Sequence, residues 1–82
     1  TIEILPNPTD DIFKINVIGL QDVYTLQVEL LDVTGRVLET GRLVKYDEIL
    51  TGQMSLRTFP KGVYLLRIKH PDIHRLAKVL RW

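Results

Sequence analysis

Apolar residues at every second position are the feature that most constrains the fold of this 82-residue chain. The pattern is clearest in residues 24–32 and 62–70, where its apolar members are Tyr24, Leu26, Val28 and Leu30, then Tyr64, Leu66 and Ile68. A period of two places one face of a strand in the core and the other in water. No segment longer than a few residues has the 3.6-residue period of a helix, so the chain is predicted to be all-β.

We expect seven short strands in a single domain over residues 1–82, namely 2–5, 12–18, 24–32, 36–44, 53–57, 62–70 and 73–81. Phe13, Ile15 and Val17 would point into the core from the second strand. In the last strand Ala77 and Val79 share one face while Leu76, Leu80 and Trp82 share the other, which calls for a bulge or for burial of both faces. This arrangement is typical of a small immunoglobulin-like or fibronectin-like antiparallel β-sandwich.

Turn residues separate these strands. Asp32-Val33-Thr34-Gly35 predicts a tight hairpin, because Asp32 can accept backbone N–H bonds and Gly35 can take a positive φ. Phe59-Pro60-Lys61-Gly62 has the proline and glycine positions of a type I turn. Pro6-Asn7-Pro8 denies two backbone donors to a ladder, so the first strand should end there. Residues 45–52 are predicted to form a flexible loop.

Composition bears on several classes of protein. The chain has no cysteine, so a disulfide framework or a thiolate metal site is excluded. No apolar run approaches the length of a membrane helix, and we expect no membrane insertion. The net charge of +1 is unevenly divided, since residues 1–56 carry four basic and nine acidic side chains and residues 57–82 carry seven and one. A nucleic-acid binder is usually basic across the whole domain, so we expect no nucleic-acid partner.

Side chains for catalysis are few. Ser55 is the only serine and falls in a predicted strand, where it is best explained as a half-buried strand residue. His70 and His74 are four apart, but the Pro-Asp pair between them indicates a turn and not the helix that would align both imidazoles on a metal. Asp10-Asp11 and Asp47-Glu48 lack the glycine-punctuated pattern of a calcium loop and should be solvated. We therefore expect no enzyme, no metal site and no cofactor.

A sugar-binding or adhesion module is the alternative that the residues leave open, because β-sandwiches can present flat aromatic side chains to carbohydrate rings. Three aromatics fall on apolar alternations and are predicted to be core residues: Phe13, Tyr24 and Tyr64. Three others remain for such a platform: Tyr46, Phe59 and Trp82. Nothing in the sequence brings these three together.

The opening Ile4-Leu5-Pro6-Asn7-Pro8-Thr9-Asp10, the central Asp32-to-Arg36 turn and the later Lys61-to-Leu66 run occur in an order that resembles a known family. Together with the basic end they are similar to the type A C-terminal sorting domain of the type IX (Por) secretion system of Bacteroidetes. Two positions depart from the family pattern: Asp11 replaces a common glycine, and Arg81-Trp82 replaces consecutive lysines. By resemblance the recognition residues are Pro6, Asn7, Pro8, Asp10, Asp32, Gly35, Lys61, Gly62, Tyr64, Lys78 and Arg81.

The resemblance implies a sorting signal at the C-terminus of a larger exported protein, and a chain that starts at Thr1 without methionine fits such a piece. The attached N-terminal cargo would pass through the periplasm to the outer-membrane translocon. A sortase would then remove the domain, leaving the cargo secreted or on the cell surface. We expect Pro6 to Asp10 near one edge and the basic last strand near another, the strand being recognised by pairing and charge together. A homodimer through an open strand edge is left open.

Overall fold

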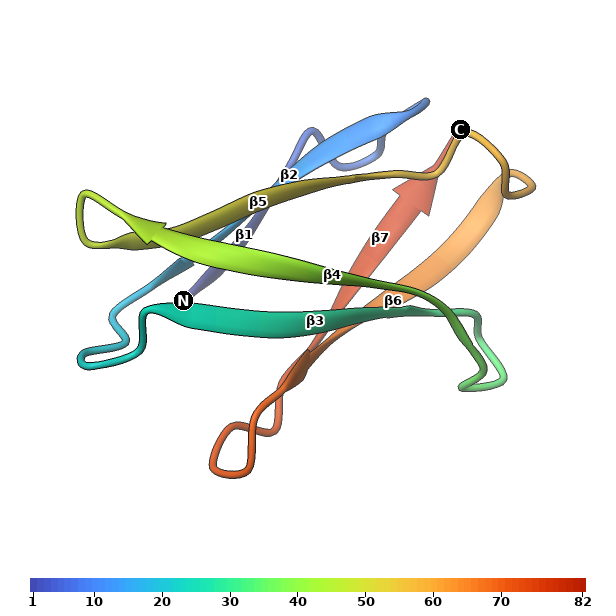
Figure 1. Ribbon diagram of the computed structural model, residues 1–82. Coiled ribbons are helices and arrows are strands. Elements are labelled where there is room, and N and C mark those ends of the chain that lie inside the picture. Colours follow the sequence, from blue (N-terminus) through green and yellow to red (C-terminus); the bar gives the residue numbers. More distant parts are fainter.

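The computed structural model describes residues 1–82 as seven antiparallel strands with no helix (Figure 1). The strands are β1 (Ile2–Leu5), β2 (Ile12–Ile18), β3 (Thr25–Leu31), β4 (Val37–Tyr46), β5 (Ile49–Ser55), β6 (Gly62–Lys69) and β7 (Leu76–Arg81). The predicted all-β class and the number of strands are confirmed. The chain has no helix of the length and hydropathy needed to cross a membrane.

Strand β4 turns one continuous sheet into a sandwich. The strand order is β1-β2-β5-β4-β3-β6-β7, and β4 pairs with β3 from Val37 to Val44. Its pairing with β5 is limited to Val44, Lys45 and Tyr46. Beyond these three residues β4 and β5 diverge, so β1, β2 and β5 form one layer while β4, β3, β6 and β7 form the other (Figure 1).

The core fills the space between these two layers with alternate side chains from both. Its fourteen buried members are Phe13, Ile15, Val17, Leu26, Val28, Leu30, Leu43, Leu50, Met54, Leu56, Tyr64, Leu66, Ile68 and Val79. The inward direction predicted for β2, β3 and β6 is therefore confirmed. The prediction for Tyr24 is wrong, because β3 begins one residue later and the Tyr24 side chain is 66% exposed. Its ring lies beneath the Lys45 ammonium, 5.4 Å from the ring centroid.

The loop predicted for residues 45–52 is also wrong. β4 continues to Tyr46 and β5 begins at Ile49, so only Asp47 and Glu48 connect them. Both connecting residues have positive φ, 51° and 70°, which is the geometry of a two-residue hairpin. Neither residue is glycine or asparagine, and Gly52, which suggested a loop, lies inside a strand.

The final hairpin is more regular than expected. β7 begins at Leu76 and pairs with β6 from Arg67↔Leu76 to Gly62↔Arg81 without a bulge. The hydrogen-bonded turn before β6 spans residues 56–59, three residues earlier than the predicted 59–62. In it the Phe59 N–H donates to the Leu56 carbonyl at 2.9 Å. The predicted end of β1 before the first proline is confirmed.

Candidate recognition site

Strand direction brings the three sequence motifs to one end of the sandwich. Ile12 pairs with Ser55 and Gly62 pairs with Arg81, which places the turns before β2 and before β6 beside the end of β7. The β3–β4 turn at residues 32–36 lies at this same end, which we call the motif end (Figure 1). The N-terminus and the loops at 19–24, 47–48 and 70–75 lie at the other end.

The segment Pro6 to Asp10 runs directly beside β7. The Asn7 Nδ2 donates to the Lys78 carbonyl at 2.8 Å, and the Leu80 N–H donates to the Asn7 Oδ1 at 3.0 Å. The Thr9 N–H donates to the Leu80 carbonyl at 2.8 Å, and the Trp82 N–H donates to the Thr9 carbonyl at 3.0 Å. We expected the opening motif and the last strand near different edges. This prediction is wrong, because these four bonds hold them side by side at the same edge.

The residue types of this segment suit an edge cap. A side-chain amide carries both a donor and an acceptor, so Asn7 pairs with β7 as a peptide group of a neighbouring strand would. Pro6 and Pro8 have no N–H to offer to a further strand. Proline at a sheet edge is one way in which proteins prevent unwanted strand pairing. We call Pro6 to Thr9 the edge cap.

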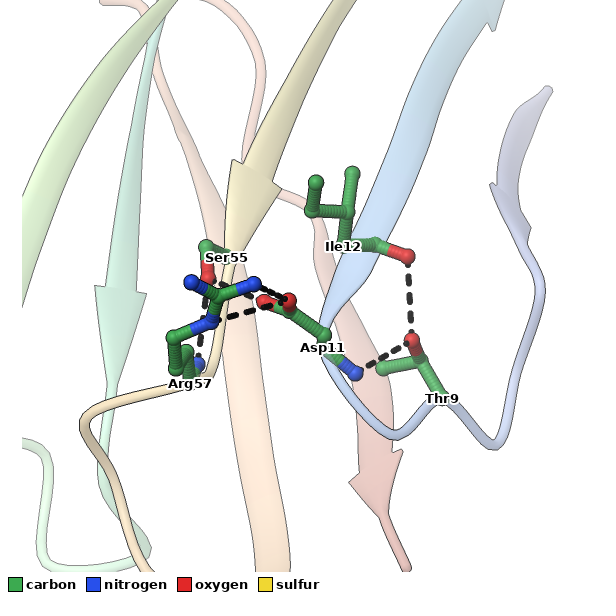
Figure 2. Close-up of polar contacts among 5 residues, drawn as sticks. All are labelled: Thr9, Asp11, Ile12, Ser55 and Arg57. Atoms are coloured by element: carbon green, nitrogen blue, oxygen red, sulfur yellow. Dashed lines mark hydrogen bonds and ion pairs between the residues drawn. The ribbon is translucent and has the colours of Figure 1, made fainter.

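Asp11 ties the other side of this segment to β5 (Figure 2). Its Oδ2 accepts from the Arg57 Nε at 3.1 Å and Nη2 at 2.7 Å, and its Oδ1 accepts from the Ser55 hydroxyl. The Thr9 hydroxyl, which is buried, accepts from the Asp11 N–H at 3.2 Å and donates to the Ile12 carbonyl at 3.0 Å. The bonds from Ser55 and then Arg57 lower the pKa of the Asp11 carboxyl. Asp11 is therefore not the solvated loop residue that was expected.

The central turn is organised by Asp32, as predicted. Its Oδ1 accepts from the Thr34 N–H at 2.9 Å, from the Arg36 N–H at 3.0 Å and from the Thr34 hydroxyl. Gly35, with φ of 91°, donates its N–H to the Asp32 carbonyl at 3.0 Å and closes the hairpin. The bond from the Thr34 hydroxyl is the main cause of a lowered pKa at Asp32. Asp32 and Gly35 shape the turn and need not contact a partner.

Tyr64 in the third motif is a core residue with a polar tether. Its side chain is buried and its hydroxyl donates to the Pro60 carbonyl four residues upstream, which is the tyrosine corner of immunoglobulin-like folds. The Phe59 ring packs on it with centroids 6.1 Å apart. Gly62 has φ of 150°, where a side chain would be strained, while Lys61 is exposed. Within this motif only Lys61 presents charge to solvent.

The two basic residues of the last strand lie on opposite faces. Lys78 is exposed on the outer face of β7. Arg81 shares the inward face with Val79 and is partly buried. Its Nη1 donates to the Trp82 carbonyl at 3.4 Å, and its Nε is buried without a hydrogen-bond partner. The odd spacing between the two residues predicts this difference, because side chains alternate along a strand.

The remaining expected site residues are distributed as follows. Asp10 and Pro6 are exposed at the motif end, and Pro8 is half-buried there. His70 and His74 lie in the β6–β7 loop, where His70 Nδ1 accepts from the Asp72 N–H at 3.1 Å. No group of three or more His, Asp or Glu side chains is placed to hold a metal ion.

Two of the three aromatics left for a sugar platform are exposed but far apart. Tyr46, 77% exposed, ends β4 at the end opposite the motifs, and Trp82, 65% exposed, follows β7 at the motif end. Phe59 is half-buried against Tyr64. The structure does not bring them to one surface.

The fold and the bonds between the edge cap and β7 define the class of protein. It is a small immunoglobulin-like domain in which the segment Pro6 to Thr9 covers part of an edge strand. Comparison with known families then gives the particular group. Residues 3–80 match the secretion system C-terminal sorting domain, and the chain belongs to that family. The match runs from β1 to within β7, so it includes the edge cap and all three motifs. No curated protein matches the chain significantly. The chain is thus a sorting signal of a secreted protein.

Proposed function

We propose that this domain directs an attached protein through the type IX secretion machinery of a Bacteroidetes cell. The family match supports the sorting role. The observation that carries the mechanism is the set of four bonds between the edge cap and β7, because it joins the opening motif and the last strand into one surface. Recognition of that surface requires shape and charge but no reactive group, so we propose a domain that is not an enzyme and needs no cofactor.

The placement of the N-terminus suits this role. Thr1 lies at the end of the sandwich opposite the motif end (Figure 1). A folded cargo joined before Thr1 therefore leaves the motif end accessible to the outer-membrane translocon. We propose that the cargo crosses the periplasm with this domain, that the translocon binds the domain, and that a sortase then removes it at the cell surface.

A reporter fusion tests the proposal. Residues 1–82 are joined to the C-terminus of a periplasmic fluorescent protein and expressed in a type IX-competent host. We expect extracellular fluorescence, and we expect the reporter to remain periplasmic in a strain that lacks the outer-membrane translocon. The same residues placed at the N-terminus of the reporter serve as a control. Equal release from both strains would refute the proposed route.

A further inference from the structure

The outer face of the layer formed by β4, β3, β6 and β7 carries six apolar side chains among its polar ones. Cross-strand pairs share a face, so the pairs Leu31↔Leu65 and Val63↔Leu80 both lie on the side opposite the core. Leu31 is only 3% exposed although it faces away from the core. We call this surface the outer apolar face, and its members are Leu31, Val37, Val63, Leu65, Leu76 and Leu80.

Positive charge lies on this face and on the side of it that is next to the β6–β7 loop. Lys78 pairs with Leu65 and is flanked on the same side of β7 by Leu76 and Leu80. A groove of about 800 Å³ lies between this face and the β6–β7 loop, and its lining includes Arg67, Lys69 and Arg75. The one carboxylate in that lining, Glu29, is only 7% exposed and pairs with Arg67 at 2.7 Å and Lys69 at 3.9 Å. Lys78 and Arg75 have no acidic partner in the domain, so the face suits an acidic partner.

The adjoining edge of β7 calls for a polypeptide. The N–H and the carbonyl of Leu80 both point away from β6 and bond the edge cap. In an antiparallel strand every second residue points its backbone groups the same way, so those of Leu76 and Lys78 also point away from β6. The edge cap forms a hydrogen bond with the Lys78 carbonyl. It forms none with the Leu76 N–H, the Leu76 carbonyl or the Lys78 N–H. These three groups form an uncapped stretch of strand beside the outer apolar face. An extended peptide can pair with them, whereas a lipid surface cannot.

We propose that Leu76 to Lys78 is the docking edge at which an extended, acidic strand of the export machinery adds to β7. Its backbone pairs with Leu76 and Lys78, its apolar side chains lie against the outer apolar face, and its carboxylates meet Lys78 and Arg75. The proposal rests on the proposed function, since it names the part of the domain that the machinery binds. This part is the stretch of β7 that continues from the edge cap toward the β6–β7 loop, in the layer that does not carry the N-terminus.

A pair of substitutions at one residue tests the backbone pairing in the reporter fusion. Leu76→Pro removes the outward N–H without loss to the β6 ladder, because this N–H points away from β6 and proline is tolerated at the first residue of a strand. Leu76→Ala removes the side chain and keeps the N–H. We expect export of the Leu76→Pro fusion to fall by about tenfold relative to Leu76→Ala. Equal export of the two would overturn the proposal.

A charge pair tests the chemistry of the partner. Lys78→Glu should reduce export strongly, while Lys14→Glu, an exposed lysine of β2 in the other layer, should leave it unchanged. Thermal unfolding of each purified domain confirms that the variants are folded. If Lys78→Glu abolishes export while Leu76→Pro and Leu76→Ala are exported equally, the outer apolar face binds an anionic lipid surface and not a strand, and the proposal fails. If the unmodified domain exports nothing, the proposed function itself fails.

Discussion

At the scale of single residues, side-chain bonds replace backbone pairing at the motif end. Asp11, Asp32 and Asn7 each bond two or more partners there, and each stands where the chain turns or leaves a strand. The sequence identified Asp32, because an aspartate bonding its own turn is a local event. It did not identify Asp11, whose partners Ser55 and Arg57 lie more than forty residues away. Local chemistry is readable from the sequence, and these distant partners are not.

The lowered pKa of Asp11 predicts how acid destabilises the domain. A carboxyl whose folded pKa lies below its ordinary value of 3.8 stabilises the fold above that pH, and this contribution is lost as the pH falls through the folded value. In the Asp11→Asn variant we expect the free energy of unfolding to fall less steeply below pH 3.8 than in the wild type. The remaining fall would be due to Asp32, whose pKa is also lowered. Urea unfolding measured across that range tests this. A slope for Asp11→Asn that matches the wild-type slope would contradict the prediction.

At the scale of elements, the sequence predicted the strands that have one clean apolar face and misplaced those that do not. β2, β3 and β6 alternate regularly and lie close to where the sequence puts them. β4 and β5 meet in a two-residue turn of Asp47 and Glu48, which lacks the glycine or asparagine that usually announces such a turn. Both strands also leave the sheet plane where the layers part, so their burial does not alternate strictly. Tertiary geometry decided these bounds.

Gly52 permits the close approach of β4 and β5 at the point where the layers separate. A Cβ at this position would lie 2.8 Å from the Leu43 Cδ2 and 2.9 Å from the Arg42 carbonyl oxygen, and the backbone oxygen cannot move freely. We expect Gly52→Ala to lower the free energy of unfolding by about 1–3 kcal/mol. Gly41→Ala is the matched control, because its Cβ would make ordinary van der Waals contacts with the Val28 and Met54 side chains at 3.4–3.5 Å. Chemical denaturation of both variants measures the difference, and equal stabilities would argue against a steric role for Gly52.

At the scale of the whole molecule, the strand order creates the surface that we propose for recognition. The Asn7 amide and its partners on β7 are 71 and 73 residues apart, and they meet because β1 and β7 are the two ends of one sheet that folds over on itself. The sequence predicted each motif and its order but not their meeting, since the strand order is not encoded in any local pattern. The same closure caps the edge from the Lys78 carbonyl to the Trp82 N–H, and it leaves open the Leu76 N–H, the Leu76 carbonyl and the Lys78 N–H. Folding itself thus determines which part of the edge is available to a partner.

This partial cap makes a prediction about self-association. Asn7→Ala leaves the Lys78 carbonyl and the Leu80 N–H without partners, which extends the open edge of β7. Open strand edges pair with one another, so we expect the variant to form dimers at concentrations where the wild type is monomeric. Loss of two hydrogen bonds should also lower its stability by about 1–3 kcal/mol. Light scattering over a concentration series measures the mass, with Asn16→Ala, which loses its bond to Thr51 on β5 away from this edge, as the control. An Asn7→Ala domain that stays monomeric wherever the wild type does would show that the amide is not what keeps this edge from pairing.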